Sequence, residues 1–385
     1  MSDDTTKDPA KATALAAQSR VIDGIRMPLM LAVIFIHSYG PAMTADATGL
    51  MAAYEYLRIA GSHVLTHCCV PAFFLISGYL FFFNIRELDK ATYVAKLRRR
   101  VRSLFIPYLL WNVLYIGCII LAKYVAIRFM GRDPDGLPFL LHSIDWHWFW
   151  DSHWWSLDHW NLFGFAVAHS SPALVPLWYL RDLIILSMLT PLLYYLLKHF
   201  GRAFVGLLVV LYLLNLWPNI PGLSITGLCY FTVGAYVGLS KQLLTETLYR
   251  YRHFFAIATI LLFFPELMFN GSNTLVGLTI YPYFIFATTI SAFNLASWLE
   301  RRGHLSLSIR LAPATFFVYA LHSIYVVAIS GFICKHLLPW ETPLSLTARY
   351  LFAPFLTCAL CLLGYYLMAR ICPSILQILI GGRKK

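Results

Sequence analysis

Long apolar stretches recur along the whole chain, and they constrain its fold more than any other feature. About 20 apolar residues in a helix cross the hydrocarbon core of a bilayer. Of the 385 residues, 59% are hydrophobic and 12% are charged, a composition typical of an integral membrane protein. The sequence therefore predicts an all-α, polytopic membrane protein of about ten transmembrane helices, at 21–40, 64–83, 104–127, 175–198, 203–218, 222–240, 253–269, 275–298, 312–334 and 347–371.

Basic residues gather in alternate connections between these helices. One group holds 86–102, 198–202, 241–252, 301–310 and the C-terminal RKK, whereas the opposite connections are nearly bare of lysine and arginine. The positive-inside rule then places both termini in the cytoplasm. We expect a disordered cytoplasmic tail at 1–20, one transmembrane domain at 21–371 with an outer loop at 128–174, and a basic tail at 372–385. The expected location is a cell membrane, most simply a bacterial inner membrane.

Two ionisable residues lie in the first apolar stretch. Arg26 and His37 are separated by ten uncharged residues, so a helix would place both on one face, roughly 16 Å apart along its axis. Ionisable side chains are costly in lipid and indicate a functional site. Arg26 has an alternative interpretation as an interfacial arginine paired with Asp23. His37 is better explained as the lining of a cavity.

Five segments, in order, resemble one protein family. They are RVIDGIRMPLMLAVIFIHS, VPAFFLISGYLFF, KLRRRVRSLFIPYLLWN, PLWYLRDLIILSMLTPLL and FFVYALHS. Together they are similar to the acyltransferase-3 family of integral membrane O-acyltransferases, from about residue 20 to residue 371. The resemblance implies transfer of an acyl group, usually acetyl from acetyl-CoA, to a hydroxyl on a surface glycan or a similar acceptor.

The resemblance also suggests roles for particular residues. His37 matches the catalytic histidine and is expected to act as general base or transient acyl carrier, with Arg26 holding or orienting the donor. Arg99 and Arg102 match the paired basic positions, and with Arg98 they are expected to bind CoA phosphates. A basic run at a membrane surface is equally explained as a topology signal facing anionic lipid.

Weaker candidates come from two later helices. Arg181, beside Trp178, is either half of a plain charge pair with Asp182 or a stabiliser of oxyanion charge. His322 and Tyr319 share a helix face and either line the active cavity or pack between helices.

The outer loop is rich in tryptophan and histidine. Trp154 and Trp155 represent a possible acceptor platform, because indole faces stack on sugar rings. An interfacial aromatic helix explains the same composition.

Three further residues carry no assigned role. His63 and His67 have the spacing of two metal ligands, but no third ligand is evident and no metal site is expected. Glu266 belongs to no recognisable motif.

Two rival function classes remain open from the sequence, a secondary transporter and a glycan polymerase or lipid-linked sugar transferase. For the acyltransferase, acetyl-CoA is a co-substrate and no cofactor is held permanently. The expected partners are acyl-CoA, a hydroxyl-bearing acceptor and membrane lipid, with no nucleic acid. The sequence does not indicate the acceptor, the acyl chain or the oligomeric state.

Overall fold

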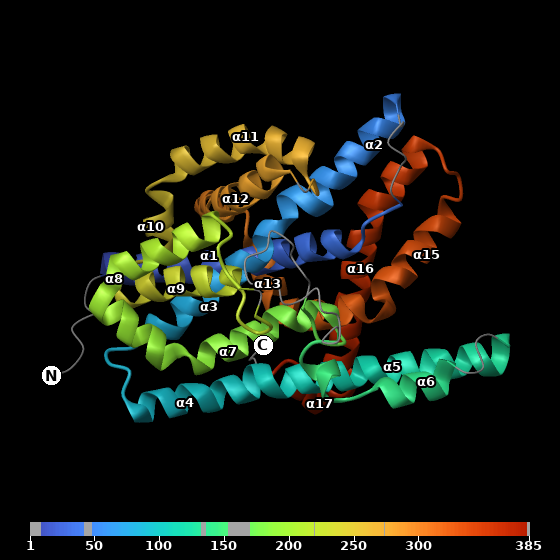
Figure 1. The fold of residues 1–385 in the computed structure, drawn as a ribbon, viewed down its shortest axis with the longest axis horizontal. Helices are drawn as coiled ribbons and strands as arrows, with labels where there is room; N and C mark the ends of the chain where they lie inside the picture. The colour runs from blue at the N-terminus through green and yellow to red at the C-terminus, as the bar shows by residue number, and fades with distance from the viewer. Residues whose placement is uncertain are drawn as a thin grey trace.

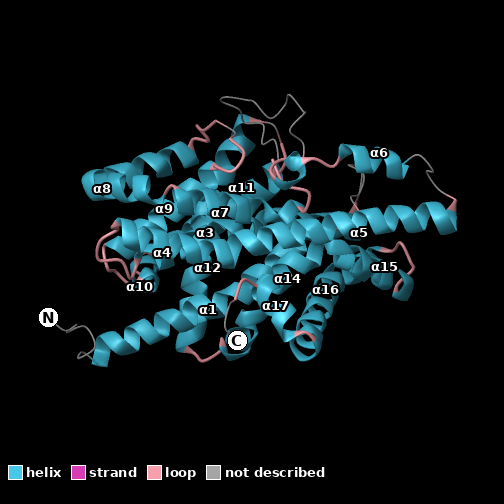
Figure 2. Cartoon of the chain, turned by 90° about the horizontal axis from the view of Figure 1, so that it is seen from below, coloured by secondary structure: helices cyan, strands magenta, loops and turns pink. Residues whose placement is uncertain are grey.

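The fold consists of helices packed around an apolar interior (Figures 1 and 2). A computed structural model describes residues 9–41, 48–131, 136–152, 170–218, 220–272 and 274–382. Within these ranges there is no strand. The α-helices are α1 (Pro9–His37), α2 (Gly49–Ile59), α3 (Cys69–Phe82), α4 (Lys90–Arg100), α5 (Ile106–Met130), α6 (Gly136–Ser143), α7 (Trp178–Met188), α8 (Thr190–Leu213), α9 (Ile225–Leu239), α10 (Leu244–Tyr249), α11 (Arg252–Phe269), α12 (Leu275–Arg301), α13 (Ser306–Leu311), α14 (Thr315–Leu321), α15 (Val327–Leu337), α16 (Pro343–Ile371) and α17 (Pro373–Leu379).

Short π-helical and 3-10 segments join several of these helices into longer rods. The π-helical segments are η2 (Ala60–Val64), η4 (Val101–Phe105) and η9 (His322–Val326), and the 3-10 segments include η3 (Leu65–Cys68), η5 (Trp146–Phe149), η7 (Val175–Leu177) and η8 (Ala312–Ala314). A π-turn inserts an extra residue into a helix and is frequent at functional sites.

The described part of the chain contains seven helices that are long and apolar enough to cross a membrane. They are Gly49–Phe82, Lys90–Met130, Thr190–Leu213, Arg252–Phe269, Leu275–Arg301, Ser306–Leu337 and Pro343–Ile371. The all-α, multi-pass architecture is therefore confirmed. The count of ten spans and the cytoplasmic termini stay predictions, because α1, α7 and α9 are not among the seven.

Two predicted tails are partly helical instead. Helix α1 begins at Pro9, so the disordered tail predicted at 1–20 is wrong for residues 9–20. The segment KATALAAQ is rich in strong helix formers, which accounts for the extension. In the basic tail at 372–385, α17 covers Pro373–Leu379.

Helix α8 contains the turn between two predicted spans. Gly201 has φ 44° and ψ −114°, outside the helical region, and it divides the element into two helices. Figure 1 shows this ribbon bending sharply at the left of the view. The spans predicted at 175–198 and 203–218 thus correspond to α7 with the first part of α8, and to its second part. Glycine suits the turn because its positive φ is costly for other residues.

The closest helix pair at the centre is α3 with α9, and glycines make the approach possible. A Cβ on Gly234 would lie 2.1 Å from the Leu75 carbonyl oxygen, and one on Gly78 would lie 1.9 Å from the Phe231 carbonyl oxygen. Small residues at such contacts let helix backbones pack directly in membranes.

We expect Gly234→Leu to disrupt this pair. The added side chain meets backbone, which cannot move aside as a flexible side chain would, so overpacking should cost at least about 1–3 kcal/mol. Thermal unfolding of the detergent-purified protein measures the effect. Gly117→Leu is the matched control, because nothing lies within 4 Å of its added Cβ. Equal melting temperatures for the two variants would contradict the proposed tight contact.

Candidate active site

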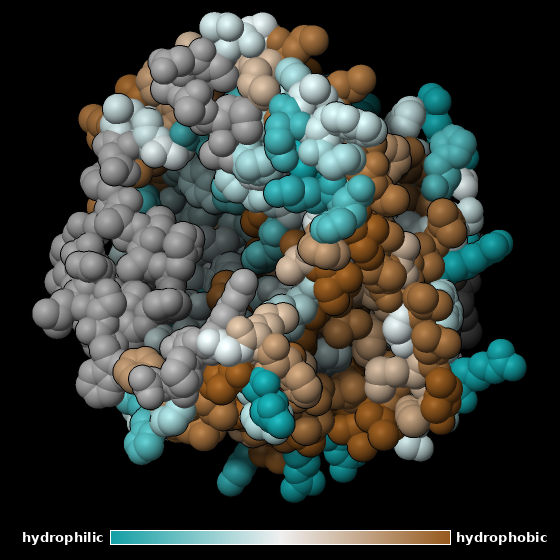
Figure 3. All heavy atoms as spheres, turned by 90° about the vertical axis from the view of Figure 1, so that its right-hand side faces the viewer, coloured by the Kyte–Doolittle hydropathy of each residue, from teal (hydrophilic) through white to brown (hydrophobic). Residues whose placement is uncertain are grey.

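Helix α1 carries both residues of the first-helix pair and crosses the middle of the molecule. It packs against α3, α12, α13, α14 and α16. Its C-terminal end points toward the right-hand side of Figure 1, and that face is hollowed, with hydrophilic atoms above the hollow (Figure 3). His37 is the last residue of this helix and its surface is exposed. The prediction that one helix holds Arg26 and His37 is confirmed.

Arg26 makes the ion pair that its alternative interpretation requires. Its guanidinium donates to Asp23 Oδ1 at 2.8 Å, and both side chains are partly exposed. An exposed ion pair contributes little to stability. The guanidinium is therefore held loosely enough to exchange Asp23 for an anionic ligand, and its role in donor binding stays a prediction.

The His322 ring lies beside that of His37. The two ring centroids lie 5.1 Å apart, and His322 is fully buried. Its Nδ1 lies 2.7 Å from the carbonyl oxygen of Tyr319. A carbonyl oxygen only accepts, so Nδ1 carries the hydrogen and Nε2 presents a lone pair. That Nε2 is buried and has no hydrogen-bond partner among the described residues.

The backbone around His322 departs from a regular helix. Segment η9 starts at His322, and inside it Tyr325 has φ 60° while Ile324 has ψ 75°. A non-glycine residue at positive φ stores strain, and such strain clusters at functional sites. The irregular turn thus begins at the histidine that lies beside α1.

Tyr319 joins α14 to the middle of the bundle. Its hydroxyl donates to the carbonyl oxygen of Pro176, and its ring lies 6.4 Å from that of His322. Tyr179 lies edge-on to Tyr319 at 6.1 Å. Trp178 packs near Phe74 of α3 at 6.2 Å. Tyr319 is thus the aromatic residue beside His322, with Tyr179 behind it, and Trp178 packs on α3.

The hydrogen-bond donors of Arg181 all bind groups of the protein itself. Its guanidinium donates to Asp182 Oδ1, to Ser170 and to the carbonyl oxygen of Trp150. These bonds occupy all five N–H donors of an arginine. Asp182 in turn accepts from the backbone N–H of Ser224, which caps α9. The structure thus favours the charge-pair interpretation over oxyanion stabilisation, because no donor remains for a substrate.

We expect Arg181→Met to destabilise the fold strongly, by about 3–5 kcal/mol, because it leaves the buried Asp182 carboxylate uncompensated. The double variant Arg181→Met, Asp182→Asn should recover much of this loss. Chemical or thermal unfolding of the purified variants checks both expectations. A folded Arg181→Met protein with normal stability and no activity would instead support a role for Arg181 in stabilising oxyanion charge.

The basic run divides into two faces. Arg98, Arg99 and Arg102 are exposed and unpaired within the described part of the chain. Lys96 and Arg100 turn inward, the first donating to the Phe81 carbonyl oxygen and the second lying 5.5 Å from the Phe81 ring centroid. The outward arginines are therefore available to phosphate oxygens.

Helix α4, which presents this run, is capped at its start. Asp89 accepts from the backbone N–H of Thr92 at 2.8 Å. This hydrogen bond with Thr92 lowers the pKa of the Asp89 carboxyl, so the cap stays ionised at neutral pH. The cap fixes the first turn of the helix that carries the arginines.

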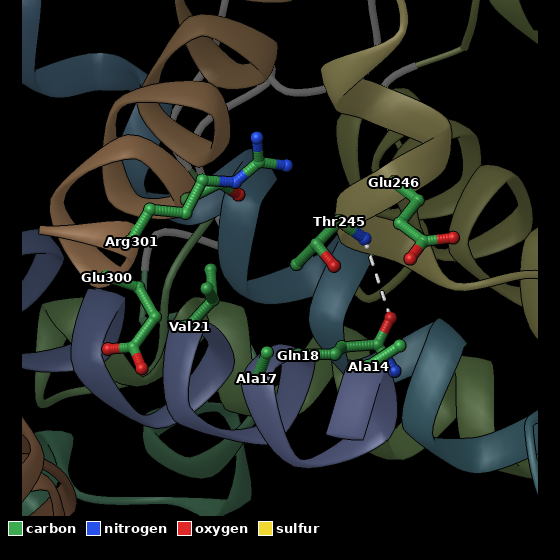
Figure 4. Close-up of a pocket in the computed structure, with 9 residues that line it drawn as sticks. Ala14, Ala17, Gln18, Val21, Thr245, Glu246, Glu300 and Arg301 are labelled. Carbon is green, nitrogen blue, oxygen red and sulfur yellow. Dashed lines mark hydrogen bonds between the residues drawn. The ribbon is translucent and has the colours of Figure 1, made fainter. Parts of the chain in front are cut away.

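Neither His37 nor His322 lines either of two cavities among the described residues. One of about 80 Å³ is lined by α1, α10 and α12, where Gln18 Oε1 accepts from the Thr245 N–H (Figure 4). Its charged lining is two glutamates, Glu246 and Glu300, against one arginine, Arg301, and this balance is unsuited to a polyanion. The other, of about 620 Å³, is apolar and lies between α5, α14, α16 and α17.

The predicted acceptor platform, Trp154 and Trp155, lies outside the described residues. Other residues near the site were missed by the sequence analysis: the inward-facing Arg100, Tyr179, and a fully buried Arg58 near the end of α1. Arg58 could have been suspected because it is charged and lies near a predicted span.

Comparison with known proteins identifies the class. The acyltransferase domain family matches residues 20–366. The chain therefore belongs to the acyltransferase-3 family and is an integral membrane O-acyltransferase, which removes the transporter and polymerase alternatives. It is 26% identical over 369 residues to the succinoglycan biosynthesis protein ExoH of Rhizobium meliloti, covering 94% of this chain and 92% of that protein. No solved structure matches the chain.

Proposed function

We propose that this enzyme moves an acetyl group from cytoplasmic acetyl-CoA to a hydroxyl of a glycan on the outer side of a bacterial inner membrane. The observation that carries the proposal is the proximity of exposed His37 to buried His322, whose Nε2 has no hydrogen-bond partner among the described residues. The similarity to a protein named for succinoglycan biosynthesis supports a glycan acceptor.

In the proposed reaction His37 acts on the acceptor. An imidazole nitrogen of His37 takes the hydroxyl proton as the hydroxyl oxygen attacks the thioester carbonyl. The tetrahedral intermediate collapses, the C–S bond breaks, and the proton passes from His37 to the departing CoA sulfur. The products are the acetyl ester and CoA-SH, so no other reactant is needed.

His322 would position His37 for this step. Ring centroids 5.1 Å apart allow a nitrogen of one ring to approach a nitrogen of the other at about hydrogen-bond distance after a small rotation. An N–H of His37 donating to His322 Nε2 leaves the other His37 nitrogen unprotonated and able to act as base. Hydrogen bonds of this kind are often loose without substrate and tighten when it binds.

The donor would enter from the cytoplasmic side. CoA is a polyanion, and Arg98, Arg99 and Arg102 are exposed, unpaired among the described residues and close together at the start of the η4 and α5 rod. Guanidinium groups bind phosphate oxygens in a bidentate manner. Arg26, further along α1 on the way to His37, would hold or orient the donor.

We expect His37→Ala to lower kcat by about 10²–10⁴-fold while the protein still inserts and binds acetyl-CoA, because the variant lacks the proposed base. His322→Ala should lower kcat less and should alter the pH profile of the remaining activity, because it removes only the partner of His37. Transfer from radiolabelled acetyl-CoA and donor binding by calorimetry measure the two effects. Near-normal turnover of His37→Ala together with no activity of His322→Ala would show that His322 is the base and His37 its partner.

We expect the double variant Arg99→Ala, Arg102→Ala to raise the KM for acetyl-CoA. The difference from wild type should shrink as salt is added, since salt screens the charge contacts in the wild-type protein. The control is Arg301→Ala, Arg302→Ala, which removes two charges predicted on the same membrane side, where Arg302 lies over the Trp298 ring. Equal KM changes in both double variants would indicate that the basic run at 98–102 is a topology signal and does not bind the donor.

A further inference from the structure

A cluster of aromatic and charged side chains lies beside the end of α1, and the proposed mechanism does not use it. It consists of Tyr39, two residues beyond His37, with Arg58 of α2 and His63 of η2. The Arg58 guanidinium lies 3.5 Å from the centroid of the Tyr39 ring. The His63 ring meets Tyr39 edge-on, with centroids 4.1 Å apart.

Arg58 holds this cluster in one arrangement. It is 1% exposed and donates to both carboxylate oxygens of Glu55, and to the carbonyl oxygen of Gly40 at 3.4 Å. Burying a charge pair carries a large desolvation cost unless it is fully hydrogen-bonded. The result is a clamp between α2 and the turn after α1, which fixes one face of the Tyr39 ring.

The clamp is also tied to the helix of the active histidine. Ser62, next to His63, donates to the carbonyl oxygen of Phe35 at 2.7 Å, and its hydroxyl lies 3.0 Å from that of Tyr350. His63 therefore lies level with the last turn of α1. Tyr39 and His63 thus lie near the end of the helix that carries His37.

The cluster retains unused binding capacity. Tyr39 is 39% exposed although Arg58 covers part of its ring. The Nε2 atom of His63 is buried and has no hydrogen-bond partner among the described residues. Its neighbour His67, by contrast, is engaged with the Tyr281 hydroxyl at 3.0 Å. An exposed aromatic face beside an unsatisfied polar atom is the combination that binds a sugar ring, which has apolar faces and hydroxyl edges.

The position of the cluster fits an acceptor rather than a donor. The rod Gly49–Phe82 has 34 residues, so it is roughly 50 Å long against a hydrocarbon core of about 30 Å. Its α3 end leads into the basic α4 run, so the excess length of α2 projects on the opposite side. Figure 1 shows α2 extending beyond the end of α1 at the upper right.

We propose that Tyr39 and His63 form the acceptor subsite, in which a pyranose ring stacks on the exposed part of Tyr39 and the His63 ring turns its buried Nε2 toward a sugar hydroxyl, near His37. This inference rests on the proposed acyl transfer and specifies the class of acceptor. Arg58 acts as a positioning residue, since it touches Tyr39 and not the sugar.

The test uses the purified full chain with radiolabelled acetyl-CoA and three defined acceptors: methyl β-D-glucoside, cellotetraose and glycerol. Glycerol offers hydroxyls without a ring. Wild type should prefer the glucosides. Tyr39→Ala and His63→Ala should raise the glucoside KM by about five- to tenfold, the scale of one lost stacking or hydrogen-bonding contact. The KM for acetyl-CoA should stay unchanged, and Tyr39→Phe should behave as wild type.

Tyr56→Ala is the matched control, because Tyr56 is an exposed tyrosine on the same helix as Arg58. Three results would overturn the subsite: an equal effect of Tyr56→Ala, a parallel rise in the donor KM, or no preference for the glucosides over glycerol. If wild type hydrolyses acetyl-CoA but acetylates no glucoside, the sugar subsite fails while donor chemistry stands. If it neither binds nor hydrolyses acetyl-CoA, the proposed function itself fails.

Discussion

A polar group in the membrane interior needs a hydrogen-bond partner, and Arg181 and His322 differ in how far this need is met. Arg181 and Asp182 satisfy it completely, through Ser170, Trp150 and the N-terminus of α9. Among the described residues His322 does not, because its Nδ1 is bound and its Nε2 is not. An unsatisfied buried polar atom costs about 1–3 kcal/mol. The fold carries that cost at His322, beside the exposed histidine of α1, and the proposed reaction would use this lone pair to orient His37.

The helical rods and their order could be predicted from the sequence, since apolar length alone marks a span. The apolar stretches near 253–269, 275–298 and 347–371 coincide closely with α11, α12 and α16. The start of α1 was missed because a count of apolar residues ignores helix propensity, and an alanine-rich polar segment extended the helix to Pro9. The turn at Gly201 was located by composition, but its geometry depends on a single glycine conformation.

The candidate site could be predicted only in part. Spacing identified His37, and a resemblance identified His322, but no sequence rule gives the 5.1 Å between rings on helices 285 positions apart in the chain. For Arg181 the sequence showed a charge and not the number of its donors already in use. For the basic run, the π-turn η4 changes the helical phase just after Arg100. Lys96 and Arg100 precede this turn and share one face of α4, but a helical wheel does not show that this face meets Phe81.

Three π-helical segments link the residues of the site. Segment η2 contains His63, η4 contains Arg102 and η9 begins at His322. Each extra residue in a helix rotates the next turn of that helix by about 100°. Such a rotation lets one rod present an apolar face to lipid along most of its length and a polar side chain inward at a single level. Arg102, His322 and His63 therefore each stand at a break in a helical rod, and the proposed two-sided reaction assigns these three breaks to the donor site, the histidine pair and the acceptor site.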